Sequence, residues 1–306
     1  MDCFLGFDGG GTKTECVAIN ASGHILSRAR GPASNPTRIG FPAALAGITQ
    51  AAESALRAVE SPLEIAALCA GLAGTGTAES CAQMEQLLQQ GFPHSLVAVR
   101  TDLEVPLSAM PSGAAIVLIA GTGSAAVGRD ASGNIRRAGG LGPATGDEGS
   151  AFAIGRAAIA AVLHDDSPAA SNLARQILRH LGAVNWAELD ARAVAHADNI
   201  YPRVFPVVAA AADSGNPLAQ SLLQSAAEDL AAIAEQLDSS LQLREQAFPL
   251  GKTGGTVSRS QFFDQAIDHQ LRLRFPNAVI TALHLDPANV AAKIALQLYQ
   301  QQNGAH

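Results

Sequence analysis

The sequence has little charge of either sign and lacks any long apolar run. Charged residues make up 15% of the 306 residues and hydrophobic residues 48%, and the net charge is −7. The apolar runs at 116–120 and 207–212 fall far short of the roughly 20 residues that a membrane-spanning helix needs, and the first six residues do not read as a signal peptide. We therefore expect a cytoplasmic protein without a membrane partner, with a large buried core in one large or two medium domains.

The sequence also lacks the residues that three kinds of site would need. No cluster of lysine or arginine is visible, so a nucleic-acid partner is not expected. The eight histidines are scattered without metal-ligand spacing, which argues against a metal site built from protein ligands alone. The four cysteines include no Cys-x-x-Cys pair, and we interpret them as buried free thiols (Cys3, Cys16, Cys69 and Cys81).

Short apolar runs between glycine-rich turns predict strands, and alanine-rich stretches with helical spacing predict helices. In the first half the predicted strands are 3–7, 15–20, 24–30, 65–72 and 96–100, with helices at 41–59 and 78–90. In the second half the strands are 114–120, 125–129, 134–139, 248–250 and 279–281, with a mostly helical stretch from 150 to 243 and a last helix at 287–302. This alternation indicates an α/β fold. The order of strands and turns recurs weakly in the second half, and the boundary between the two halves falls near 110–113.

Two turns rich in glycine and threonine are candidates for phosphate binding, one in each half. The first is Asp8–Thr14, where consecutive glycines let backbone N–H groups approach an anion, and Thr12, Lys13 and Thr14 add donors. The second, Gly121–Ser124, repeats this chemistry. Each is also compatible with a plain hairpin, but two such turns could hold one triphosphate from both sides.

Three groups of carboxylates accompany these turns. Asp8 could hold Mg²⁺, directly or through water. Asp102 follows a strand, where it could accept a proton from an attacking hydroxyl or could simply cap a helix. Asp147 and Glu148 end the glycine-rich run 139–150 and could accept hydrogen bonds from sugar hydroxyls; the alternative is a capped helix start with two solvated acids.

Together these motifs resemble the N-acetylglucosamine kinase group within the BadF/BadG/BcrA/BcrD ATPase family. The resemblance rests on Asp8–Thr14, Ser34-Asn35, Thr101-Asp102, Ala120–Ser124 and Gly146–Ser150. It is clear to about Arg156 and weaker from there through Gly254–Thr256 to the last helix. Residues 289–292 depart from the family, which often has Gly-Ala there.

The resemblance implies two actin-like, ribonuclease H-like α/β domains with a ligand cleft between them. The implied domains are 1–112, 113–286 with a helical insertion, and a terminal helix at 287–306 that packs back on the first domain. The resemblance implies phosphate contacts at Thr12 and Thr122, nucleoside contacts at Gly255 and Thr256, and Asp102 as the catalytic base. It implies sugar contacts at Asn35, Asp102, Asp147 and the turn Gly140, Leu141 and Gly142. The chemistry of the turns themselves adds Gly10, Gly11, Lys13, Thr14 and Gly123 as expected phosphate contacts, Ser124 and Glu148 as expected sugar contacts, and Asp8 as the expected ligand of Mg²⁺.

The function implied is an ATP- and Mg²⁺-dependent kinase of an amino sugar, foremost N-acetylglucosamine to N-acetylglucosamine 6-phosphate. Glucosamine and N-acetylmuramic acid are the alternative sugars. The segment 32–39 offers amide, hydroxyl, methyl and guanidinium groups but no carboxylate, which favours a neutral or anionic substituent over an ammonium. Arg38 keeps the lactyl carboxylate of N-acetylmuramic acid open.

Two other classes of protein remain to be weighed. ATPase activators of reductases or dehydratases hold an iron–sulfur cluster, which needs cysteine thiolates, and no cysteine follows Cys81. We therefore expect no such cluster. A sugar-sensing regulator would carry a DNA-binding segment before the first strand, which here begins at Cys3. The oligomeric state, including a homodimer, stays open.

Overall fold

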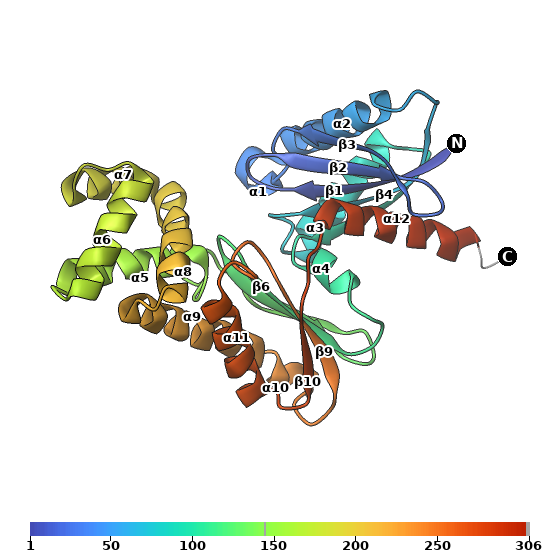
Figure 1. Ribbon diagram of the computed structural model, residues 1–306. Helices are drawn as coiled ribbons and strands as arrows, with labels where there is room; N and C mark the ends of the chain where they lie inside the picture. The colour runs from blue at the N-terminus through green and yellow to red at the C-terminus, as the bar shows by residue number, and fades with distance from the viewer. Residues whose placement is uncertain (144, 304–306) are drawn as a thin grey trace. The chain divides into compact units, whose positions relative to one another are not determined.

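The computed structural model describes residues 1–143 and 145–303. The chain divides into two compact units, each built on its own five-stranded sheet. Unit 1 comprises Met1–Ala109 and the segment that begins at Leu285, and unit 2 comprises Met110–His284 (Figure 1). The α/β class expected from the alternating pattern is confirmed.

The sheet of unit 1 has the order β3-β2-β1-β4-β5. Its strands are β1 (Asp2–Gly9), β2 (Thr14–Ile19), β3 (Ile25–Gly31), β4 (Glu64–Leu72) and β5 (Leu96–Thr101). The first three form an antiparallel meander, whereas β4 runs parallel to β1 and β5 parallel to β4. The carboxyl ends of β1, β4 and β5 therefore lie along one edge of the sheet, which is where open α/β sheets bind ligands.

Helices cover both faces of this sheet (Figure 1). The helices of unit 1 are α1 (Pro36–Ile39), α2 (Phe41–Arg57), α3 (Ala78–Gly91), α4 (Glu104–Ser108) and α12 (Pro287–Asn303). On one face, α2 and α3 pack a core that includes Ile48, Met84 and Leu88. On the other face, α12 packs alanines against β1, β2 and β4.

The contact between α12 and β1 is very close because Gly6 has no side chain. A methyl group on Gly6 would lie 2.0 Å from the backbone N of Ala292 and 2.1 Å from the carbonyl oxygen of Ala288. Ala291 and Ala292 are fully buried here. The run at 289–292, which departs from the family pattern, thus supplies small residues where the helix backbone touches the sheet.

Unit 2 has the sheet order β10-β9-β6-β7-β8. Its strands are β6 (Ala115–Ala120), β7 (Ser124–Arg129), β8 (Ile135–Gly139), β9 (Phe248–Thr253) and β10 (Ala278–Ala282). Strand β9 is longer than the predicted 248–250. Its extension includes Lys252, whose buried ammonium lies 2.5 Å from Asp268 Oδ1 and 3.7 Å from Asp264 Oδ1 on α11.

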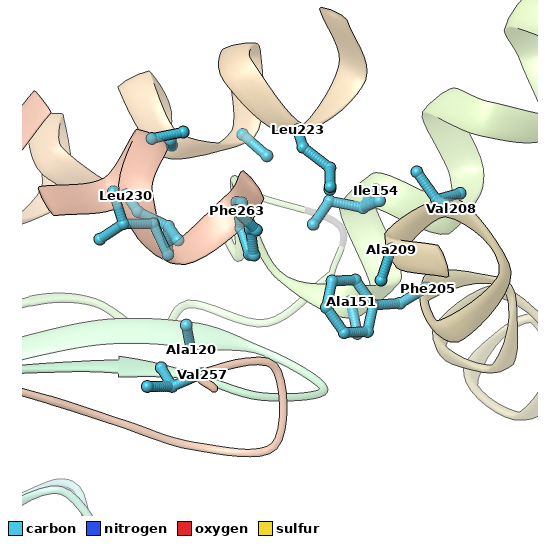
Figure 2. Close-up of a cluster of buried hydrophobic side chains, with 14 of the residues drawn as sticks. Ala120, Ala151, Ile154, Phe205, Val208, Ala209, Leu223, Leu230, Val257 and Phe263 are labelled. Carbon is cyan, nitrogen blue, oxygen red and sulfur yellow. The ribbon is translucent and has the colours of Figure 1, made fainter. Parts of the chain in front are cut away.

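A helical layer packs on this sheet and fixes the loops at its edge. Its helices are α5 (Ala151–His164), α6 (Pro168–Leu181), α7 (Trp186–Ile200), the 3-10 helix η1 (Tyr201–Val204), α8 (Phe205–Asp213), α9 (Pro217–Glu235), α10 (Asp238–Leu241) and α11 (Gln261–Arg274). Figure 2 shows Phe205 and Phe263, whose ring centroids are 5.9 Å apart, in the same buried cluster as Ala120 and Val257. These last two residues flank glycine-containing turns, so the core anchors those turns.

Three of the four cysteines are buried free thiols, as expected, and Cys81 is half-buried. Burial raises the pKa of Cys3 to about 11 and the pKa of Cys16 and of Cys69 to about 12. These three side chains are therefore protonated, inert components of the unit 1 core. Within the described residues, no helix is both long and apolar enough to span a membrane.

Candidate active site

The candidate site of unit 1 lies where β1, β4 and β5 end. Asp8 is next to the last residue of β1, and Gly9 O accepts a hydrogen bond from Ala73 N at 2.9 Å, just beyond β4. Asp102 follows β5, and its backbone N donates to Leu72 O at 3.4 Å. The topology thus brings the two predicted carboxylates, Asp8 and Asp102, to one edge of the sheet.

The first glycine turn joins β1 to β2 and is fastened to the segment at Ser34 and Asn35. Gly10 N donates to Lys13 O at 3.0 Å, while Gly10 O accepts from Ser34 N at 3.0 Å and from Asn35 N at 3.2 Å. A methyl group on Gly9 would lie 2.1 Å from Ser34 Oγ, so only glycine permits this close approach. The turn is therefore held in one geometry beside Asn35.

Three side chains of this turn were predicted as phosphate contacts, and the structure places them differently. Thr12 is exposed and open to a ligand. Thr14 is fully buried, with Oγ1 2.6 Å from Pro32 O and 2.7 Å from Ser34 Oγ, so its side chain serves the loop. Lys13 Nζ lies 2.6 Å from Glu15 Oε1 and so already has an anionic partner.

Asp8 carries its charge in an unfavourable place. Burial raises its pKa to about 6; the negative charges of Asp102 and Glu15 add to this effect, and Lys13 opposes it. A cation beside Asp8 would stabilise its ionised carboxylate, which burial and the neighbouring negative charges disfavour. Among the described residues, no group of three or more His, Cys, Asp or Glu side chains could hold a metal ion, so a cation here would be shared with a ligand. That donor set suits Mg²⁺, which uses one or two carboxylates, waters and substrate phosphates.

Asp102 does not serve as the helix cap that the sequence left open. The N-cap of α4 is Leu103, without a side-chain cap, and Thr101 Oγ1 instead accepts from Glu104 N at 3.2 Å. Asp102 is exposed at the strand end. The side chain that caps the start of α4 is therefore that of Thr101 and not that of Asp102.

Asn35 has a structural role that the sequence interpretation missed. Its Oδ1 accepts hydrogen bonds from Thr37 N at 3.1 Å, Thr37 Oγ1 at 2.7 Å and Arg38 N at 3.3 Å, which caps α1. Asparagine followed by proline at the first helical position was the available signal. With Oδ1 occupied, Nδ2 is the part of the amide that can donate to a ligand.

In unit 2, the turn Gly121–Ser124 is fastened to the start of α5. Ala151 N donates to Gly121 O at 2.9 Å, Phe152 N to Thr122 O at 3.3 Å, and Gly121 N to Gly123 O at 2.9 Å. Thr122 is exposed, whereas Ser124 is buried and its hydroxyl donates to Glu148 O at 2.7 Å. The predicted phosphate residues Thr122 and Gly123 therefore stay open, but the hydroxyl of Ser124 is already used.

Asp147 links this turn to the glycine-rich run. Its Oδ1 accepts from Ser124 N at 3.2 Å, and a methyl group on Gly123 would lie 2.9 Å from both carboxylate oxygens. Burial raises the pKa of Asp147, and the Ser124 N–H partly opposes the shift. Its φ of 64° is uncommon for a residue other than glycine, and such conformations cluster at functional sites. Glu148, Gly140 and Leu141 are exposed beside it, and Gly142 is half-buried.

The loop after β9 packs on the base of the same turn. Thr256 is buried, and its N and Oγ1 both donate to Ala120 O, at 3.1 and 2.8 Å. A methyl group on Gly254 would lie 2.1 Å from that oxygen, whereas one on Gly255 would meet nothing within 4 Å. Of the two predicted nucleoside contacts, Gly255 thus presents open backbone and Thr256 uses its side chain to hold the loop.

In sequence and in structure, the chain is similar to proteins named as N-acetylglucosamine kinases. The chain is 27% identical over 312 residues to an N-acetyl-D-glucosamine kinase of Dictyostelium discoideum, covering 96% of this chain and 98% of the relative. It is 26% identical to an N-acetylmuramic acid/N-acetylglucosamine kinase of Clostridium acetobutylicum, with 96% and 98% covered. A solved structure of a provisionally assigned N-acetylglucosamine kinase from Chromobacterium violaceum matches with a TM-score of 0.74 and 27% identity, covering 97% of this chain and 99% of that one.

These similarities confirm the expected fold class of two actin-like α/β domains. The model of the BadF/BadG/BcrA/BcrD ATPase family matches residues 5–286, well over half of the sequence. The chain therefore belongs to the BadF/BadG/BcrA/BcrD ATPase family.

Proposed function

We propose that this protein is an ATP-dependent kinase that phosphorylates a hydroxyl of an amino sugar, with N-acetylglucosamine as the foremost substrate. The observation that carries the proposal is the meeting of Asp8, Asn35 and Asp102 around one glycine turn at the edge of the unit 1 sheet. The names of the relatives, which are N-acetylglucosamine kinases, support the same activity.

In this mechanism Asp102 is the general base. As the sugar oxygen forms its bond to the γ-phosphorus, the bond from that phosphorus to the β,γ-bridging oxygen breaks and ADP leaves. Asp102 takes the proton of the attacking hydroxyl, a role worth typically ~10²–10⁴ in rate. Phosphoryl transfer asks for little covalent chemistry from the protein, so most of the catalysis is positioning and charge stabilisation.

The remaining groups divide between phosphate and sugar. The backbone N–H of Gly11 and the exposed Thr12 are assigned to phosphate, as are Thr122 and Gly123 in unit 2, whereas the N–H of Gly10 closes the turn on Lys13 O. Asp8 would hold Mg²⁺, directly or through water. When bound, that ion neutralises phosphate charge.

The sugar is assigned to groups that can hydrogen-bond hydroxyls or an amide. These groups are Nδ2 of Asn35 and the carboxylates of Asp102, Asp147 and Glu148, together with the backbone of 140–142. A free amine at C2 would be cationic and would want a carboxylate next to it. The segment around Asn35 offers none, which supports an acetamido group there, as in N-acetylglucosamine and N-acetylmuramic acid.

The experiment is a panel of N-acetylglucosamine, N-acetylmuramic acid, glucosamine and glucose with ATP and Mg²⁺, scored by ADP release. We expect sugar-dependent release, with the highest kcat/KM for N-acetylglucosamine. A preference for glucosamine by more than about tenfold, roughly 1.4 kcal/mol in transition-state binding, would contradict the assignment of the C2 pocket. No sugar-dependent release from a folded protein would contradict the function itself.

A further inference from the structure

The side chain of Arg38 lies over the first glycine turn. A methyl group on Gly11 would lie 3.0 Å from Nη1 and 3.1 Å from Cδ of Arg38. The backbone of Arg38 is held in place, because its N–H donates to both Oδ1 and O of Asn35, at 3.3 and 3.1 Å. The same cap that orients the amide of Asn35 therefore fixes the backbone position from which this guanidinium reaches the turn.

The other cation of the turn is already paired. Lys13 Nζ lies 2.6 Å from Glu15 Oε1, and the same oxygen is 3.1 Å from Arg30 Nη2 on the neighbouring strand. Arg38, by contrast, has no acidic partner among residues 1–143 and 145–303. Arg38 is therefore the cation of this turn that a ligand can use.

The surroundings also require a positive charge. Asp8 and Asp102 stand close enough for Asp102 to raise the pKa of Asp8. A triphosphate brought to this edge adds further negative charge. A guanidinium is suited to the task, because it stays protonated and presents several N–H donors in a plane that matches phosphate oxygens.

We propose that Arg38 is a further catalytic residue, which binds the non-bridging oxygens of the transferring γ-phosphoryl group. This proposal rests on the kinase function proposed above. As the sugar oxygen bonds to the γ-phosphorus, the bond to the β,γ-bridging oxygen breaks, Asp102 takes the hydroxyl proton and ADP leaves. Arg38 forms or loses no covalent bond; it stabilises the charge on the group in transit.

The test compares Arg38→Leu and Arg38→Lys with Arg57→Leu, at an exposed arginine on α2, as the control. With the neutral sugar N-acetylglucosamine, Arg38→Leu should lower kcat by about 10²–10³-fold, the usual effect of removing a transition-state donor. Arg38→Lys should recover part of that loss, and Arg57→Leu should leave kcat unchanged. The KM for the sugar should change little in all three.

Two results would overturn the proposal. One is a kcat for Arg38→Leu on N-acetylglucosamine that stays within a few-fold of the wild-type value. This includes the case in which only turnover of N-acetylmuramic acid falls, because Arg38 would then bind the carboxylate of that substrate. The other is a loss of kcat in Arg57→Leu that equals the loss in Arg38→Leu. Circular dichroism melts would show that each variant is folded, as expected for exposed side chains.

A second measurement separates this proposal from the kinase function. Calorimetric titration with ATP and with ADP, each with Mg²⁺ and without sugar, isolates the γ-phosphate. Arg38→Leu should reduce affinity for ATP at least tenfold and leave affinity for ADP unchanged. An equal effect on both nucleotides, or none on either, would refute the role of Arg38 even if no amino sugar were a substrate.

Discussion

Asp8 is ionised at neutral pH in surroundings that disfavour its charge. Its pKa is raised from 3.8 to about 6, chiefly by burial and then by Asp102. At about 1.36 kcal/mol per pH unit, this shift makes the ionised carboxylate cost roughly 3 kcal/mol of folding free energy. Asp8→Asn keeps the shape and removes the charge, so the variant should be more stable than wild type at neutral pH, while it lacks the carboxylate that we propose as a ligand of Mg²⁺.

The effect of Asp8 on folding stability should depend on pH. Because the pKa in the folded protein lies above that in the unfolded chain, protonated Asp8 favours folding below about pH 4, and this advantage disappears as the pH rises through 6. The stability gap between Asp8→Asn and wild type should therefore be near zero at pH 4 and reach its full value above pH 7.

Thermal melts without nucleotide, with a chelator present, measure this gap. At pH 7.5 the melting temperature of Asp8→Asn should exceed that of wild type by roughly 6–12 °C, as expected for about 3 kcal/mol in a domain of this size, and kinase activity should fall by orders of magnitude. Glu53→Gln, at an exposed acid on α2, is the control and should change neither. A variant no more stable than wild type at pH 7.5, or a gap that does not grow with pH, would refute the reasoning.

Two glycine substitutions test the close contacts on which the site depends. Gly6→Ala places a methyl group 2.0 Å from the backbone of α12, so the helix must move and unit 1 should lose several kcal/mol of stability in urea melts. The control is Gly76→Ala, whose added methyl group would meet nothing within 4 Å. Equal midpoints for the two variants would contradict the packing of α12. Gly123→Ala places a methyl group 2.9 Å from both carboxylate oxygens of Asp147 and so displaces that carboxylate. We expect kcat/KM to fall at least tenfold, with little change in stability. Unchanged kinetics would mean that Asp147 has no part in the reaction.

Much of the fold and the edge of the unit 1 site could be predicted from local pattern. Strand runs, glycine turns and the strand-end positions of Asp8 and Asp102 depend on neighbours in sequence and on the rule that parallel strands end together. The extension of β9 over Lys252 was missed, because it depends on carboxylates of α11 that pair with a lysine on a buried strand.

Some side-chain roles depend on contacts across long sequence separations. Lys13 pairs with Glu15, only two residues away, so this local partner was overlooked. Thr14, by contrast, is buried by Pro32 and Ser34, which lie 18 and 20 residues further along the chain and are not visible from the turn itself. Likewise, the need for glycine at position 6 comes from α12, at the opposite end of the chain. The composition of a motif thus predicted the position of a turn better than it predicted the partners of the side chains in that turn.

The central claim is that Asp102 is the base in a sugar kinase. The most direct measurement is single-turnover transfer from ATP to N-acetylglucosamine, with saturating Mg²⁺, for wild type and Asp102→Asn. We expect the variant to bind ATP with unchanged affinity and to transfer phosphate about 10²–10⁴-fold more slowly. Transfer by Asp102→Asn at a rate near that of wild type would contradict it.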